Sequence, residues 1–219
     1  PQNPTGRAFT RAELERIAGL AIERDLIVIS DEVHAELVLP GHRHIPIATL
    51  GPEIASRTIT LMSATKTFNI AGLRCAVAIF GSPELKQRFG SLASHIRGGL
   101  GSFGLGASAV AWTSAQPWLD DLIAYLDGNR ARIAGFVKEH LPGIAHVPPE
   151  ATYLAWLDCR ALGLPKDPYT FFLENARVAL SDGSRTGPGG AGFVRLNFAT
   201  SRPILDQILE RLAKSLARR

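Results

Sequence analysis

The chain has 219 residues and a hydrophobic content of 46%, which is enough to bury a substantial core in one or two domains. Its net charge of +4 is spread along the sequence, with a local excess only over 211–219, so the composition indicates no nucleic-acid partner. The apolar runs, such as 26–29 and 76–80, are much shorter than the roughly 20 residues that span a bilayer, which excludes a membrane partner as well.

The two cysteines, Cys75 and Cys159, lie inside or beside apolar segments. Their number and spacing match neither a disulfide framework nor a metal site. We therefore expect no metal ligands and a reducing, cytoplasmic location.

The first part of the chain predicts helices that alternate with buried strands. Thr10 and Glu13 form a capping box, which predicts a helix from there to about Arg24. Continuous apolar runs over 26–30, 58–62 and 75–80 predict strands of a sheet that contains parallel members and is covered on both faces. Ligands of such sheets bind beyond the carboxyl ends of the strands.

The second part predicts a long helix followed by a mixture of strands and helices. A glycine-rich loop over 182–192 leads into a strand and not into a helix, so it predicts a hairpin connection and no phosphate cradle. The other elements expected here are helices over 83–97, 98–114, 118–140, 168–176 and 203–218 and strands over 153–157, 178–180 and 193–198.

Lys66 follows the predicted strand 58–62, lies among serine and threonine hydroxyls, and precedes Arg74 by eight residues. This arrangement is typical of a lysine that binds pyridoxal phosphate. The amine must be held at a strand end and partly desolvated to act as a nucleophile, and a fixed cation must face the phosphate. The alternative is a surface lysine with a solvated ammonium group.

Four motifs occur in an order that is shared with a known family. They are Asn3-Pro4-Thr5-Gly6, Ser30-Asp31-Glu32-Val33-His34, Ser63-Ala64-Thr65-Lys66 with Arg74, and the strand 193–198 with Arg195. With them the whole chain resembles the fold type I pyridoxal phosphate-dependent aminotransferase family (class I/II). The segment 149–158 and the histidine in the second motif resemble the branch that contains cystathionine β-lyase and other carbon–sulfur lyases.

The resemblance implies an α/β fold. Residues 1–117 would form a three-layer α/β/α remnant of the large cofactor-binding domain. Residues 118–219 would form the interdomain helix and a small α+β C-terminal domain.

The resemblance also implies a role for each cofactor-binding residue. Asn3 would donate to the phenolic oxygen of pyridoxal phosphate, and Asp31 would pair with the pyridine nitrogen. His34 stands where many aminotransferases have a tyrosine that contacts the same phenolic oxygen. Ser63 and Arg74 would bind the phosphate. The alternatives are a turn asparagine, a helix-capping aspartate, a structural histidine and a surface arginine.

Lys66 would be the catalytic Schiff-base lysine, and Arg195 would bind the α-carboxylate of the substrate. An arginine between apolar neighbours is costly without an anion, so substrate and an internal aspartate are the two candidate partners of Arg195.

The function implied is a β-lyase that releases thiol, pyruvate and ammonia from an S-substituted cysteine such as cystathionine. An amino-acid aminotransferase is the alternative, and a regulatory binding module fused to a DNA-binding domain is a third possibility. The substrate would be a small amino acid, and the full-length protein a homodimer. Because the family places part of its site upstream of the asparagine motif, we expect these 219 residues alone to bind pyridoxal phosphate weakly or not at all and to be inactive.

Overall fold

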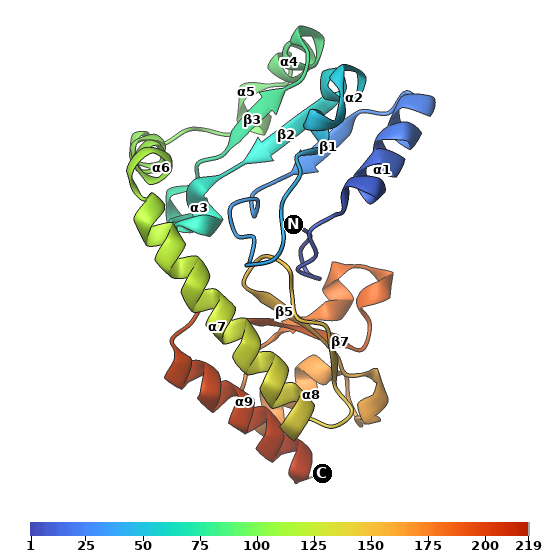
Figure 1. Cartoon of the computed structure of the whole chain (residues 1–219), viewed down its shortest axis with the longest axis vertical. Helices are drawn as coiled ribbons and strands as arrows, with labels where there is room; N and C mark the ends of the chain where they lie inside the picture. The colour runs from blue at the N-terminus through green and yellow to red at the C-terminus, as the bar shows by residue number, and fades with distance from the viewer. Residues whose placement is uncertain (219) are drawn as a thin grey trace. The chain divides into compact units, whose positions relative to one another are not determined.

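A computed structural model describes residues 1–218 and shows an α/β protein with two separate sheets (Figure 1). The chain forms two compact units. The first unit contains Pro1, Ala8–Val38 and His42–Asp121, and the second unit contains Gln2–Arg7, Leu39–Gly41 and the chain from Leu122 onward. The predicted α/β class is confirmed, whereas the predicted domain division at 117/118 stays a prediction.

The sheet of the first unit has the order β1–β2–β3. β1 (Val28–Asp31) and β2 (Thr58–Met62) are parallel, and β3 (Val77–Phe80) is antiparallel to β2. The prediction of parallel members is therefore correct for one of the two strand pairs. β2 has the predicted bounds, and the other two strands start two residues later than predicted.

The helices of the first unit begin with α1 (Arg11–Glu23), and the predicted capping box is confirmed. The backbone N–H of Glu13 donates to the Thr10 hydroxyl at 3.3 Å, and the Thr10 N–H donates to the Glu13 carboxylate at 2.8 Å. The remaining helices and 3-10 turns of this unit are η1 (Ile47–Leu50), α2 (Pro52–Ser56), α3 (Ala64–Thr67), η2 (Ala71–Leu73), α4 (Pro83–Gly90), α5 (Ser94–Arg97) and α6 (Ser102–Ser114).

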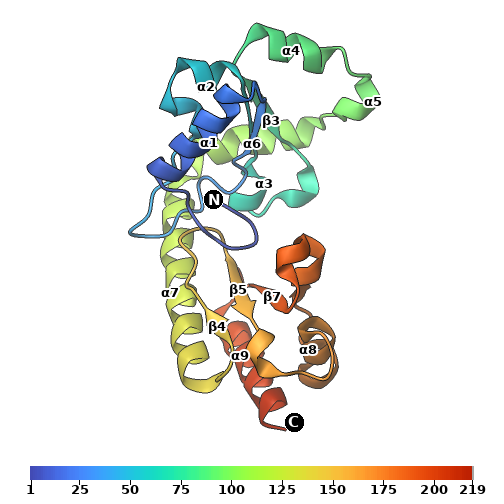
Figure 2. The ribbon, with the colours of Figure 1, turned by 90° about the vertical axis from the view of Figure 1, so that its right-hand side faces the viewer.

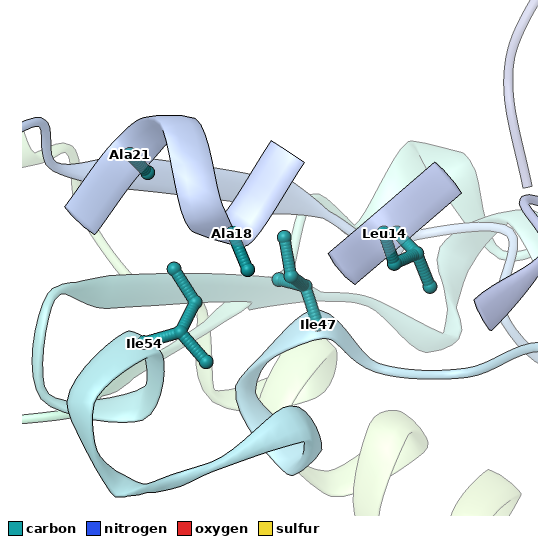
Figure 3. Packing of buried hydrophobic residues seen from close by; sticks show 5 residues of the cluster. All are labelled: Leu14, Ala18, Ala21, Ile47 and Ile54. Atoms are coloured by element: carbon teal, nitrogen blue, oxygen red, sulfur yellow. The ribbon is translucent and has the colours of Figure 1, made fainter. Parts of the chain in front are cut away.

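A small apolar core joins α1 to the segment that follows β1. Leu14, Ala18 and Ala21 of α1 face Ile47 and Ile54, and all five side chains are buried (Figure 3). The spacing of the three α1 residues places them on one side of the helix. This stripe is the buried side of α1.

Other apolar side chains of the first unit remain exposed. Ile29 of β1 is 66% exposed, Ile79 of β3 is 51% exposed and Phe103 of α6 is 83% exposed. The prediction that both faces of this sheet are covered is therefore wrong for residues 1–218. Every second residue of β1 and β3 is exposed, which is the pattern of strands with one face open to solvent.

The second unit has an antiparallel sheet of order β4–β5–β7–β6. Its strands are β4 (Ala145–His146), β5 (Leu154–Asp158), β6 (Ser181–Asp182) and β7 (Phe193–Asn197). Its main helices are α7 (Gln116–His140), which begins in the first unit, α8 (Pro168–Ala176) and α9 (Arg202–Ala217), and a short turn η3 (Arg160–Leu162) follows β5. The sequence predicted all but β4, η3 and the exact position of β6.

Helices α7 and α9 lie side by side (Figures 1 and 2). Arg132 of α7 donates to Asp206 of α9 at 2.7 Å. The buried Asn129 of α7 donates to the carbonyl oxygens of Phe198 and Thr200 at 2.9 and 3.0 Å, and its own carbonyl accepts from Arg202 at 2.8 Å. One side chain therefore ties α7 to both ends of the turn between β7 and α9.

The glycine-rich loop forms two short 3-10 turns, η4 (Gly183–Thr186) and η5 (Pro188–Gly190). A Cβ atom on Gly190 would collide with the carbonyl oxygen of Gly183, so the two turns can pack this closely only because the side chain is absent. The loop connects the antiparallel strands β6 and β7, which confirms the predicted hairpin. None of the helices within residues 1–218 combines the length and the hydropathy that crossing a bilayer requires.

Candidate active site

Lys66 lies just beyond the carboxyl end of β2. The strand ends at Met62, Ser63 caps α3, and Lys66 is the third residue of that short helix. Its side chain is exposed. The expectation of a partly desolvated amine is therefore wrong for the residues that the structure describes, because the neighbouring elements leave Lys66 open to solvent.

The Ser63 hydroxyl ties the end of β2 to the segment before β3. Its oxygen lies 2.6 Å from the Cys75 carbonyl oxygen and 2.7 Å from the Thr65 hydroxyl. Because a carbonyl can only accept, Ser63 donates its proton to Cys75 and Thr65 donates to Ser63. Both hydroxyl protons are used inside the protein, so the Ser63 hydroxyl must rotate before it can donate to a phosphate.

Asp31 ends β1 and lies opposite Leu61 of β2. Since β1 and β2 are parallel, Asp31 and the segment that carries Lys66 follow the same edge of the sheet (Figure 1). Asp31 is exposed, and its Oδ1 accepts from the Val33 N–H at 3.2 Å. The carboxylate thus stabilises a local turn through Oδ1, and its other oxygen can accept from a proton donor.

Glu32, the next residue, carries a buried carboxylate that the sequence did not single out. It accepts from His44 Nε2 at 2.8 Å and from the Ser30 hydroxyl at 2.9 Å. Burial would raise the pKa of Glu32, but these hydrogen bonds outweigh it and hold the pKa below its ordinary value. The pair anchors the loop after β1 to the strand that presents Asp31. The only sign of this pair in the sequence is that a histidine follows Glu32 by twelve residues.

His34 and Arg74 differ in their exposure. His34 is buried within the turn after β1, where its carbonyl accepts from the Leu37 N–H at 3.0 Å. Arg74 is exposed, and it ends η2 in the left-handed backbone region with φ 48°. Its guanidinium is therefore accessible to an anion, whereas His34 is set in place by packing.

Arg195 and Asn3 meet in the second unit although they are far apart in the sequence. Arg195 Nη1 donates to Asn3 Oδ1 at 2.7 Å, and Nη2 donates to the Ser181 hydroxyl at 3.1 Å. Because a guanidinium only donates, the Asn3 carbonyl must face it, which leaves the Asn3 amide hydrogens to donate elsewhere. The sequence missed Ser181, which lies opposite Arg195 on the neighbouring strand.

The charge of Arg195 is not neutralised by a carboxylate within residues 1–218, since its two hydrogen-bond partners are neutral. Its Nε atom is buried and has no hydrogen-bond partner among these residues. The nearby Tyr153 stays protonated: burial raises the pKa of its hydroxyl, and the Arg195 charge offsets only part of this. No aspartate within residues 1–218 forms an ion pair with Arg195, which leaves the substrate carboxylate as the other candidate partner.

The predicted site residues thus fall into two groups. Asn3 and Arg195 contact each other in the second unit. The first unit holds the others, which are Asp31, His34, Ser63, Lys66 and Arg74. No cluster of three or more His, Cys, Asp or Glu residues in the described part of the chain could hold a metal ion. Burial, with a contribution from the neighbouring Asp158, raises the pKa of Cys159 to about 12, so this thiol stays protonated.

Comparison with known proteins identifies the family of the chain. The profile of the aminotransferase class I and II family matches residues 1–212. The chain belongs to this family. Among curated family members, cystathionine beta-lyase PatB of Bacillus subtilis is 37% identical over 99% of the chain, and MalY of Escherichia coli is 36% identical over 94%. The chain spans 57% and 53% of the lengths of these two relatives.

Solved structures of the family have the same fold. Cystalysin from Treponema denticola, whose crystal structure contains pyridoxal 5'-phosphate, matches the whole chain with a TM-score of 0.94 at 32% identity. The aromatic aminotransferase from Pyrococcus horikoshii matches it with a TM-score of 0.87 at 29% identity. The chain covers 56% and 58% of these two structures. The predicted fold class and family are therefore confirmed.

Proposed function

We propose that this chain carries the lysine-bearing part of a pyridoxal phosphate-dependent carbon–sulfur β-lyase. The observation that supports it most directly is Arg195, a partly buried guanidinium that neutral partners hold in place and that retains its charge for a carboxylate. The curated relatives named cystathionine beta-lyase, at 32% and 37% identity, support the lyase branch.

The residues present fit pyridoxal phosphate. When bound, this cofactor supplies an aldehyde that captures an amine and a ring that takes up the electrons of a broken Cα–H bond. Lys66 would attach it and, once released by the substrate amine, would take the Cα proton. The Asp31 carboxylate would keep the ring nitrogen protonated.

The remaining groups would hold the cofactor in place. The free amide hydrogens of Asn3 would donate to the phenolic oxygen, and the exposed Arg74 guanidinium would bind the phosphate. Ser63 would join Arg74 only after its hydroxyl turns away from Cys75. The buried His34 would contact the phenolic oxygen or support the turn beside it.

The products follow from the balance of bonds. Lys66 would remove the Cα proton, the Cβ–S bond would break, and the sulfur would leave with its bonding electrons and take up a proton as a thiol. Water would then hydrolyse the remaining three-carbon unit. One S-substituted cysteine and one water thus become one thiol, one pyruvate and one ammonium ion.

Transamination is the second candidate, because the chain is also 27% identical to an aspartate aminotransferase of Bacillus subtilis. The full-length protein is incubated with pyridoxal phosphate and L-cystathionine, and free thiol and pyruvate are measured. The lyase proposal expects both products. If neither forms while an added keto acid is converted to an amino acid, the protein is an aminotransferase.

Two variants test the role of the lysine. Lys66→Ala should abolish product formation and the absorbance of lysine-bound cofactor, a loss of about 10³-fold or more, because it removes the amine that would both attach the cofactor and act as the base. Lys86→Ala, which removes an exposed lysine from α4, is the matched control and should retain both.

We further propose that the full-length protein is a cytoplasmic homodimer and that it acts on a small amino acid. Exposed apolar side chains on α5 and α6, among them Ile96 and Phe103, support a further packing partner for the first unit. Light scattering of the full-length protein tests the dimer. A monomer at micromolar concentration would contradict it.

A further inference from the structure

A cavity of about 410 Å³ opens beside Arg195 in the second unit. Its wall is built from the hairpin between β6 and β7 together with α8. The residues that matter for its charge are Asp182, Arg185 and Arg195, and Tyr169 and Thr186 add hydroxyl groups. None of the roles assigned above accounts for Arg185 or Asp182.

Arg185 is available to a ligand. Its side chain is 84% exposed, and its Nε lies 3.7 Å from Asp182 Oδ2, beyond hydrogen-bond distance. Asp182 is engaged more closely with Ser184, accepting from its N–H at 2.9 Å and from its hydroxyl at 2.7 Å. The carboxylate thus caps its own turn and holds Arg185 only loosely.

The charges of this cavity are unequal. Arg185 and Arg195 each contribute one positive charge, and Asp182 contributes one negative charge. Asp182 lies 3.7 Å from Arg185 Nε and offsets its charge without a hydrogen bond, so a ligand with a single carboxylate on Arg195 would leave Arg185 with this long contact alone. A second carboxylate at the other end of the ligand would give the Arg185 guanidinium direct hydrogen bonds, which are shorter and stronger than its contact with Asp182.

We propose that Arg185 selects substrates whose sulfur substituent ends in a carboxylate, while Arg195 binds the α-carboxylate of the same molecule. This inference rests on the proposed lyase function, because it assigns the second end of that substrate. Cystathionine carries such a distal carboxylate, and simple S-alkyl cysteines do not.

Two substrates that differ only in charge test the proposal. S-carboxymethyl-L-cysteine ends in a carboxylate, and S-carbamoylmethyl-L-cysteine ends in an amide of nearly the same size. Thiol release by the full-length holoenzyme is measured with each, and the ratio of the two kcat/KM values is compared between proteins. We expect a ratio of about five in favour of the carboxylate, the size typical of a solvent-exposed charge pair.

Three variants sharpen the comparison. Arg185→Gln should bring the ratio to about one, and Arg185→Lys should restore part of the preference because it restores the charge without the planar fork. Arg211→Gln removes an exposed arginine from α9 and should leave the ratio unchanged. A wild-type ratio of one, or a preference that survives Arg185→Gln, would overturn the proposal.

A binding measurement separates this inference from the lyase proposal. The affinity of the holoenzyme for each compound is measured by following the absorbance of the bound cofactor. If thiol forms from neither compound but the carboxylate still binds more tightly and Arg185→Gln removes the difference, the lyase reaction is wrong and the role of Arg185 stands. If both compounds release thiol at equal kcat/KM and bind equally, the lyase reaction stands and the role of Arg185 is wrong.

Discussion

The two units bury their apolar side chains to different extents. In the second unit, helix α8 packs against β6, β7 and α9, and Phe172, Leu205 and Leu209 are fully buried. In the first unit, one small core joins α1 to the segment after β1, while Ile29, Ile96 and Phe103 stay open to solvent. The second unit therefore has a core of its own, and the first unit presents apolar surface that is suited to packing against another element.

The contrast predicts a large loss of stability for one phenylalanine substitution and a small loss for another. Phe172→Ala, in the buried core of α8, should lower the free energy of unfolding by about 3–5 kcal/mol, because it removes apolar contacts and leaves a cavity. Phe103→Ala is the matched substitution on α6 and should cost less than about 1 kcal/mol where its ring stays exposed. Urea unfolding followed by circular dichroism measures both. A large loss for Phe103→Ala would show that the full-length protein covers this side chain.

Asn129 tests whether a buried hydrogen-bonding side chain contributes more to the stability of the second unit than an exposed one does. Asn129→Ala should cost about 2–3 kcal/mol, since it leaves the carbonyl oxygens of Phe198 and Thr200 without their donor. Asn175→Ala removes one hydrogen bond from an exposed side chain and is the matched control, with an expected cost below about 1 kcal/mol. Equal costs in urea unfolding would contradict the special role of Asn129.

Glu32 provides the corresponding buried polar contact of the first unit, and it is sensitive to pH. Its pKa in the folded protein lies below the ordinary value of 4.5, so its stabilisation is complete above pH 4.5 and disappears as the pH falls through the folded pKa. Glu32→Gln should destabilise the protein by about 1–2 kcal/mol at pH 7. It should also make unfolding less dependent on pH below 4.5 than in the wild type. Urea unfolding at pH 7 and pH 3 measures this, and an unchanged acid dependence would contradict it.

The smallest expected effect concerns the start of α1. Thr10→Ala removes the hydroxyl that accepts from the Glu13 N–H and should cost about 1 kcal/mol. Thr10→Ser retains the cap and should stay within about 0.5 kcal/mol of the wild type. If both variants unfold alike, the helix does not depend on its capping box.

Local patterns predicted most of the secondary structure. The Thr10–Glu13 box and the apolar spacing of α7 are signals that a short window contains, and both elements appear where expected. β6 and β4 are only two residues long, too short for a repeating pattern, and the sequence misplaced the first and missed the second. The sequence predicted that β3 is a strand but not that it is antiparallel to β2. This direction depends on the path by which the chain returns to the sheet.

The sequence by itself determined the identity and order of the site motifs: a lysine after a strand, an aspartate at the end of another strand, and an arginine between apolar neighbours. The tertiary structure alone decided what these groups contact. It joined Arg195 to Asn3 and Ser181, set Glu32 against His44, and left Lys66 exposed. The physical reason is distance along the chain. A motif records neighbours within a few residues, whereas a hydrogen bond between Asn3 and Arg195 exists only once packing has brought two remote segments together.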